Sequence, residues 1–226
     1  MQRITVKAFP PTGLARERRG KTFIGISLKG PLVGAPLRRE VLDWTQSNVG
    51  TPDLFVGDYL NRHNYQAFDR VPEAQAIEQA MRDGARTIDH LKGLLSAWGV
   101  VDVAITSASC LYKDPSFSSR LARFNKQYSE NESFKTLIDR AVDAYLTRKR
   151  HDKKPDENVS RHCVAYQLEE LVLFELLAEA NYRTLVYAGP QLPVMKSIVS
   201  GQLKGASDAL EALTLIELRT HGDRSV

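Results

Sequence analysis

The chain has 226 residues, a formal net charge of +4 and only two cysteines. This length suits one large domain or two small ones with a sizeable core. The cysteines provide neither a disulfide framework nor a metal cluster, which fits a reducing compartment. No apolar leader opens the sequence and no stretch approaches a membrane span. We therefore expect a cytoplasmic protein whose mild positive charge is compatible with a polyanionic partner.

Residues 1–21 are predicted to form a flexible basic arm, because two prolines and two glycines accompany four cations in its second half. Those cations are Arg16, Arg18, Arg19 and Lys21. This composition is compatible with either a solvated loop or a phosphate-binding arm.

Residues 22–30 read Thr-Phe-Ile-Gly-Ile-Ser-Leu-Lys-Gly and predict a buried strand that ends in a turn. Ser27 then lies at the carboxyl end of a central strand, where open α/β sheets bind ligands. Gly25 would let the backbone approach a ligand or a neighbour closely. The alternative is that Ser27 merely caps the next helix. The spacing matches neither a phosphate loop nor a nucleophile elbow, because Lys29 stands where the elbow needs glycine.

Strands and helices alternate along the rest of the chain, which predicts one doubly wound, Rossmann-like parallel α/β domain over residues 22–220. Strands are expected at 53–58, 100–106 and 184–187, and helices at 36–48, 72–98, 115–128, 131–148, 160–180 and from about 191. Residues 148–154 read as a basic loop, and residues 221–226 as a frayed tail.

Three stretches, in this order and spacing, resemble the tRNA-dependent cyclodipeptide synthases. The first is residues 23–27 with Trp44 in the following helix, the second is residues 52–58, and the third is residues 166–174 with residues 185–187 beyond it. The resemblance covers roughly residues 20 to 200. It implies a fold like the catalytic domain of class I aminoacyl-tRNA synthetases. It also implies a reaction without ATP, cofactor or metal that uses two aminoacyl-tRNAs in sequence.

The resemblance also implies roles for particular residues. Ser27 matches the serine that becomes aminoacylated, Tyr166 and Glu170 match the pair that holds the amino group, and Tyr187 matches the tyrosine implicated in ring closure. An aminoacyl-tRNA is an activated ester, so a positioned hydroxyl can accept its acyl group. A phenol and a carboxylate four residues apart lie on one helix face and can hold an ammonium group over that hydroxyl. A ping-pong reaction through an aminoacyl-enzyme and a dipeptidyl-enzyme is therefore expected.

The matching substrate pocket is apolar, which favours an apolar first side chain. Its residues would be Phe23, Gly25, Gly30, Phe55, Leu173 and Leu185. Glu169 lies beside this set, so an arginine substrate stays open. The five histidines show no metal-ligand spacing and are predicted to lie on the surface.

The sequence departs from the family pattern in three places. Gly30, and Ala188 after Tyr187, reproduce neither subgroup signature, and Leu171 replaces a common proline. The helix over 74–98, basic in many members, holds only Arg82, Arg86 and Lys92 among acids. The tRNA contact is therefore expected at the arm of residues 16–21 or at a second cluster. That cluster consists of Arg148, Lys149, Arg150, Lys153 and Lys154.

Two other functions are alternatives to the cyclodipeptide synthase activity that the resemblance implies. A non-catalytic module that binds tRNA or a nucleotide could keep the same fold. A serine esterase is disfavoured, because no histidine stands at a plausible triad position and the nucleophile elbow is absent. In either case we expect a monomer without a membrane or metal partner.

Overall fold

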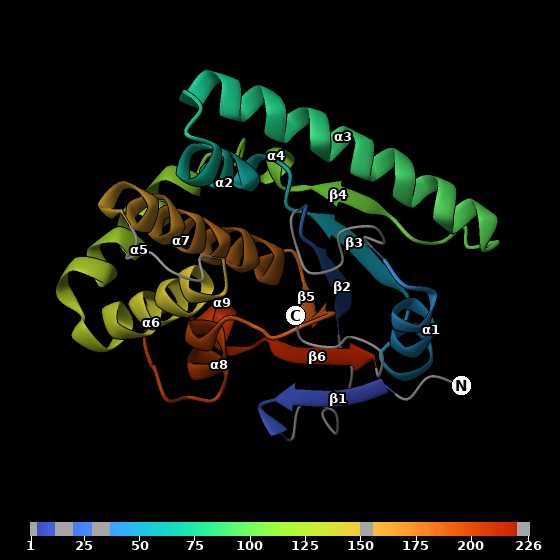
Figure 1. The fold of residues 1–226 in the computed structure, drawn as a ribbon. Coiled ribbons are helices and arrows are strands. Elements are labelled where there is room, and N and C mark those ends of the chain that lie inside the picture. Colours follow the sequence, from blue (N-terminus) through green and yellow to red (C-terminus); the bar gives the residue numbers. More distant parts are fainter. Residues whose placement is uncertain (1–3, 12–19, 29–36, 150–155, 221–226) are drawn as a thin grey trace.

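A six-stranded sheet lies between two layers of helices in the computed structural model, which describes residues 4–11, 20–28, 37–149 and 156–220 (Figure 1). The strand order is β1-β6-β5-β2-β3-β4. All neighbours run parallel except β1, which is antiparallel to β6. The bounds are Ile4–Phe9 for β1, Lys21–Ile26 for β2, Pro52–Val56 for β3, Ile105–Ser107 for β4, Tyr182–Tyr187 for β5 and Thr214–Thr220 for β6. The predicted Rossmann-like α/β fold is confirmed, with an antiparallel edge strand added.

Strand β2 lies in the middle of the sheet and sends alternate side chains to opposite faces. Its neighbours are β3, where Phe55 is opposite Gly25, and β5, where Leu185 is opposite Phe23. Phe23 packs in one apolar cluster, whereas Ile24 and Ile26 pack in the other. Alternate side chains of β2 therefore contribute to the apolar clusters on both faces of the sheet, and Phe23 and Gly25 face the same side.

Two helices cover the face that receives Ile24 and Ile26, namely α1 (Arg39–Asn48) and α3 (Glu73–Ala97). Among the described residues, no helix, not even the 25-residue α3, is long and apolar enough to cross a membrane. The apolar positions of α3 recur at helical spacing, which buries one stripe and leaves the rest in solvent. The buried members of this cluster include Val41, Leu42, Leu54, Val56, Leu91 and Leu95.

The other face, on the side of Phe23, is covered mainly by α7 (Glu157–Glu179). Asp156 begins α7, and its side chain accepts a hydrogen bond from the backbone amide of Asn158 at 2.9 Å. Around α7 lie α5 (Phe117–Glu130), α6 (Glu132–Lys149), α8 (Pro193–Val199) and α9 (Asp208–Glu211) (Figure 1). The short elements η2 (Tyr59–Asn61), α2 (Arg62–Asn64), η3 (Tyr65–Asp69) and α4 (Ala108–Leu111) complete this layer.

Helix α3 passes directly over the end of β3. A Cβ atom on Gly84 would lie 2.3 Å from Cβ of Asp58, so only glycine fits at this crossing. Asp58 is buried and accepts hydrogen bonds from the backbone amide and the hydroxyl of Ser109, at 2.8 and 2.7 Å. These contacts tie α3, β3 and α4 together at the carboxyl edge of the sheet.

The structure corrects several boundaries predicted from the sequence. Within the expected arm, Ile4–Phe9 form β1, and Lys21 opens β2. The expected final helix is replaced by α8, α9 and the sixth strand, and β4 is shorter than predicted. Residues 59–69 are helical and were not expected to be. The predictions at Arg16, Arg18, Arg19, Gly30, Arg150, the rest of the second basic loop and the frayed tail lie outside the described residues.

Candidate functional site

Ser27 follows β2 at the carboxyl edge of the sheet and is partly exposed. The end of β3 stays beside it, because the backbone amide of Gly57 donates to the carbonyl of Ile26 at 3.0 Å. The next described helix, α1, begins at Arg39 with Arg38 at its N-cap position. Ser27 therefore does not cap α1, and its hydroxyl lies at the edge where parallel strands bind ligands.

The ring of Tyr187 lies against Gly25 and Gly189. A Cβ atom on Gly25 would lie 3.3 Å from ring carbon Cδ2 of Tyr187, and one on Gly189 would lie 3.3 Å from Cε1. Tyr187 ends β5, which is the neighbour of β2. Glycine at position 25 therefore makes room for this ring two residues before Ser27, and it brings the Tyr187 side chain to the end of β2.

Tyr166 and Glu170 are one helical turn apart on α7, separated by about 40° around its axis. Burial, followed by the charge of Glu170 and the phenols of Tyr187, Tyr145 and Tyr112, raises the pKa of Tyr166 well above its usual value. These groups therefore lie close enough to influence one another. The structure thus brings Tyr166, Glu170 and Tyr187 together beside the strand that leads to Ser27.

The Glu170 carboxyl group is unusual because no described residue compensates its charge. Within the part of the chain that the structure describes, no hydrogen bond or ion pair reaches it, and burial alone raises its pKa to about 8. Glu170 is nevertheless partly exposed by surface area. A carboxyl group that is surrounded by protein and still reachable is typical of a site wall, where a ligand can supply the missing partner.

Of the expected pocket residues, the four apolar side chains lie in one buried cluster, and Leu185 of that cluster lies next to Gly25. Phe55, Leu173 and Leu185 are each at most 5% exposed. The ring of Phe23 lies edge-on to Phe55 at 6.1 Å and to Tyr182 at 5.6 Å between centroids. This packing makes a continuous apolar floor on the α7 side of β2.

Glu169, the neighbour that competed with Glu170 in the sequence, has a different environment. Its carboxylate is 2.7 Å from the Arg62 guanidinium and 3.1 Å from Nε2 of His63, and it accepts a hydrogen bond from the Tyr112 hydroxyl at 2.5 Å. Burial raises the pKa of Glu169, but His63, Arg62 and Tyr112 together lower it below its usual value. Glu169 is therefore an ion with its charge already matched, and it is not available to a cationic substrate.

The contact from His63 corrects the prediction that the histidines lie on the surface. His63 is 7% exposed, whereas His90 is exposed and His162 is partly so. His151 and His221 lie outside the described residues. Among the residues with described positions, no three His, Cys, Asp or Glu side chains could hold a metal ion together.

The expected tRNA-binding residues are not brought to this edge where they are described. Lys21 opens β2, six residues before Ser27, so about 20 Å of strand separates them. The backbone of Arg148 and Lys149 forms the end of α6. On α3, Arg82 is paired with Glu78 and Arg86 with Asp83, at 2.5 and 3.5 Å.

Comparison with known structures finds the same fold across nearly the whole chain. A cyclodipeptide synthase from Fluoribacter dumoffii matches with a TM-score of 0.78 and 18% identity, covering 98% of this chain and 99% of that chain. A Mycobacterium tuberculosis protein, described as showing that cyclodipeptide synthetases are related to type I tRNA synthetases, matches at 0.71 and 14%, covering 96% and 94%. A cyclodipeptide synthase from Candidatus Glomeribacter gigasporarum, bound to Phe-tRNAPhe, matches at 0.64 and 22%, covering 91% and 90%.

A comparison with curated protein sequences found no match. The family described as cyclodipeptide synthase, by contrast, matches residues 13–200, which is most of the chain. That range contains Ser27, Tyr166, Glu170 and Tyr187 together with β2, β3, β4 and β5, whereas β1 precedes it and β6 follows it. The chain belongs to the cyclodipeptide synthase family of aminoacyl-transferring enzymes.

Proposed function

We propose that this enzyme joins two aminoacyl groups from aminoacyl-tRNAs into a cyclic dipeptide through acyl intermediates on Ser27. The observation that carries the proposal is the uncompensated Glu170 carboxyl group beside Tyr166 and Tyr187, at the strand edge that presents Ser27. The structural relative bound to Phe-tRNAPhe supports the choice of substrate.

In the first step, the Ser27 hydroxyl oxygen attacks the ester carbonyl of one aminoacyl-tRNA. The acyl–oxygen bond to the tRNA breaks, and the tRNA leaves with the proton of the serine hydroxyl. Glu170 and Tyr166 hold the amino group of the bound acyl moiety during this transfer. Because the ester is already activated, the serine needs positioning more than it needs a strong base.

In the second step, the amine of the Ser27-bound aminoacyl group attacks the ester of a second aminoacyl-tRNA. The ammonium must lose a proton to become a nucleophile, and the carboxylate form of Glu170 can accept it. The ester bond to the second tRNA breaks, this tRNA leaves with the second proton that the attacking nitrogen loses, and the product is a dipeptidyl group on Ser27. Its free amino group then attacks the Ser27 ester, which closes the ring and restores the serine hydroxyl. Tyr187, whose ring lies against Gly25 two residues before Ser27, is proposed to assist this last step.

The first substrate is proposed to carry an uncharged side chain. The floor below Gly25 is apolar, and a buried charge there would need a partner. Glu169 is already matched by Arg62, so it cannot provide that partner for a substrate arginine or lysine.

The test is to express the protein in a bacterial host and analyse the medium by mass spectrometry for cyclic dipeptides. We expect a new cyclic dipeptide that is absent from the host alone, and its mass identifies both amino acids. In parallel, incubation of the purified protein with aminoacyl-tRNA should add one aminoacyl mass to the intact chain. Binding of tRNA without product and without adduct would instead indicate the non-catalytic module.

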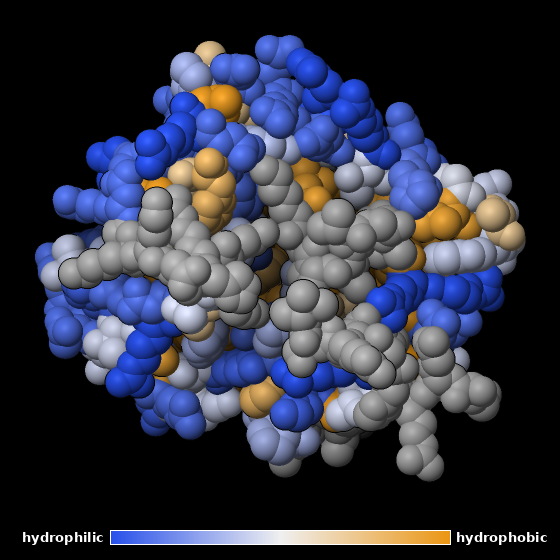
Figure 2. Space-filling view, in the orientation of Figure 1, coloured by the Kyte–Doolittle hydropathy of each residue, from blue (hydrophilic) through white to orange (hydrophobic). Residues whose placement is uncertain are grey.

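The tRNA contact is proposed to lie away from α3. Hydrophilic side chains predominate on the upper edge of the molecule, where α3 lies (Figure 2). On α3, however, Arg82 and Arg86 are paired with acids of the same helix. The cluster at Arg148, Lys149 and Arg150 is our first alternative, and the arm at residues 16–21 is the second.

Neutralising Arg148, Lys149 and Arg150 together should weaken binding of aminoacyl-tRNA. Phosphate contacts release counterions, so the slope of log affinity against log salt should flatten by about two to three units if all three touch phosphate. Single-turnover acyl transfer at saturating aminoacyl-tRNA should change little. The same change at Arg16, Arg18 and Arg19 tests the other arm. If neither variant alters the salt dependence of binding, the remaining candidates for the tRNA contact are Arg82, Arg86 and Lys92.

A further inference from the structure

A buried ion pair lies next to Tyr166 on the α7 side of the site. Glu169 is 6% exposed and Arg62 is 8% exposed, and their charged atoms are 2.7 Å apart. Taking two charges out of water is costly, and such a pair often adds little net stability. Its presence beside a reactive site therefore calls for a role other than stability alone.

The guanidinium of Arg62 is held in one place by aromatic rings. It lies 4.1 Å from the ring centroid of Tyr59 and 5.3 Å from that of Tyr112, and it donates to the Tyr59 carbonyl at 3.2 Å. The two rings are themselves in edge contact at 4.5 Å. Cation–π contacts with an arginine that is shielded from water favour a fixed geometry. Arg62 is thus a rigid anchor on the helical segment that follows β3.

The ion pair with Glu169 connects Arg62 to α7. Along an α-helix, Glu169 lies about 60° to one side of Tyr166 and Glu170 about 40° to the other side. A bond from Glu169 to Arg62 therefore fixes the rotation of α7 about its own axis at the point where Tyr166 and Glu170 project. Tyr112 adds a second connection, because its hydroxyl bonds to Glu169 and its phenol is an electrostatic neighbour of Tyr166.

We propose that Arg62, Glu169 and Tyr112 are positioning residues that orient Tyr166 and Glu170 toward the acyl group on Ser27. The inference rests on the proposed function, since the orientation matters only if Ser27 accepts an acyl group. None of the three needs to touch the substrate. Their contribution is to hold the amino-group partners within the small tolerance that acyl transfer allows, because a displacement of about 1 Å can cost about 100-fold in rate.

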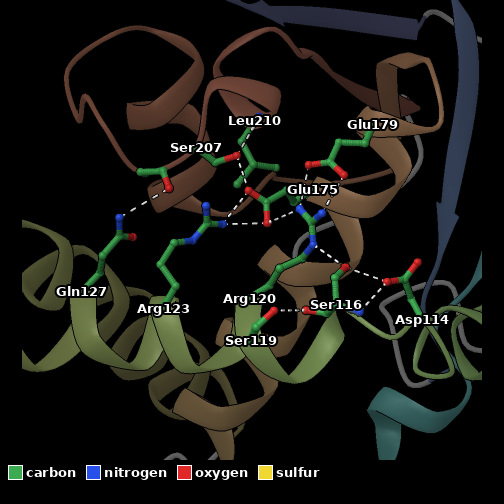
Figure 3. A network of polar contacts seen from close by, with 11 residues as sticks. Asp114, Ser116, Ser119, Arg120, Arg123, Gln127, Glu175, Glu179, Ser207 and Leu210 are labelled. Atoms are coloured by element: carbon green, nitrogen blue, oxygen red, sulfur yellow. Dashed lines mark hydrogen bonds and ion pairs between the residues drawn. The ribbon is translucent and has the colours of Figure 1, made fainter.

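A second buried glutamate on the same helix provides a matched control. Glu175 is 2% exposed and is paired with Arg120 at 2.9 Å and Arg123 at 2.5 Å, and it also accepts a hydrogen bond from Ser207 (Figure 3). It projects about 180° away from Tyr166 around the axis of α7. Glu175 therefore matches Glu169 in burial, charge pairing and helix, but it faces α5 and α9 instead of the site.

The experiment compares Glu169→Gln with Glu175→Gln in the full-length protein. Both variants should lower the melting temperature, since each neutralises a buried carboxylate that is paired with arginine: Arg62 for Glu169, and Arg120 and Arg123 for Glu175. At saturating aminoacyl-tRNA and corrected for folded protein, we expect Glu169→Gln to lower the single-turnover rate of Ser27 acylation by about 10- to 100-fold. KM should stay within about twofold, because the tRNA contacts are elsewhere. Glu175→Gln should keep both values within about twofold of the unaltered protein.

A milder pair of variants keeps the test decisive if Glu169→Gln does not fold. Tyr112→Phe removes the hydroxyl that bonds to Glu169, and Tyr128→Phe removes the matching hydroxyl that bonds to Asp139 at 2.7 Å. We expect a rate loss of about tenfold only for Tyr112→Phe, the size of one hydrogen bond to a charged group.

Equal rates for the Glu169 and Glu175 variants, and for the two phenylalanine variants, would overturn the positioning role. That outcome differs from failure of the proposed function, in which the unaltered protein itself would form no acyl-enzyme.

Discussion

Replacing Ser27 with alanine is expected to abolish both the acyl-enzyme and the cyclic dipeptide. Without the hydroxyl there is no oxygen to accept the first acyl group, and no ester for the final amine to attack. The fold should survive, because removing one partly exposed hydroxyl costs about 1 kcal/mol or less. Intact-protein mass spectrometry after incubation with aminoacyl-tRNA, together with product analysis, measures both losses.

Ser107 provides the control for this substitution. It ends β4 at the same edge of the sheet and is also partly exposed, but β3 separates β4 from β2. Ser107→Ala should therefore keep the adduct and most of the product. Product at the unaltered level from Ser27→Ala would show that another group accepts the acyl moiety, and it would remove the role proposed for Ser27.

The sequence predicted the central strands because their local pattern agrees with their final environment. Phe23, Ile24 and Ile26 form an apolar, largely β-branched run, and a strand buried on both faces needs such a run. Strand β6 was missed because Glu217 interrupts its apolar pattern. In the structure Glu217 is buried beside Lys196 and accepts a hydrogen bond from the backbone amide of Gln191 at 2.8 Å. These partners come from α8 and the segment before it, so the strand alone does not reveal them.

The candidate site shows the same division between local and tertiary information. The four-residue spacing of Tyr166 and Glu170 places them on one helix face from sequence alone. That spacing cannot say whether Glu169 or Glu170 is the reactive carboxyl group. Only the contact with Arg62, which is 107 residues away in the chain, shows that Glu169 is already compensated. No periodic or motif signal in residues 59–69 marks Arg62 for this contact.

Replacing Glu170 with glutamine is expected to lower product formation by about 10- to 150-fold, which corresponds to losing a charge-assisted contact of about 1.5–3 kcal/mol. Glutamine keeps the shape of the side chain but can neither pair with an ammonium group nor accept its proton. Tyr166→Phe removes one neutral hydrogen bond and should have a milder effect. Initial rates of product formation from purified aminoacyl-tRNA measure both variants. A larger loss in Tyr166→Phe than in Glu170→Gln would contradict the assigned roles.

The same substitution should change how stability depends on pH. Burial raises the pKa of Glu170 from 4.5 to about 8 in the folded chain, so the folded state holds this proton to a higher pH than the unfolded state does. The favourable contribution of the protonated form is fully present below about pH 4.5 and is lost as the pH rises through about 8. Glutamine does not titrate, so Glu170→Gln should become progressively more stable than the unaltered protein between these values. Because Glu170 is partly exposed, we expect a difference of about 2 kcal/mol at pH 8.5, less than the full shift implies.

Urea unfolding of both proteins at pH 5, 7 and 8.5 measures this difference in the free energy of unfolding. A difference that stays constant with pH would show that Glu170 is not held neutral by its surroundings.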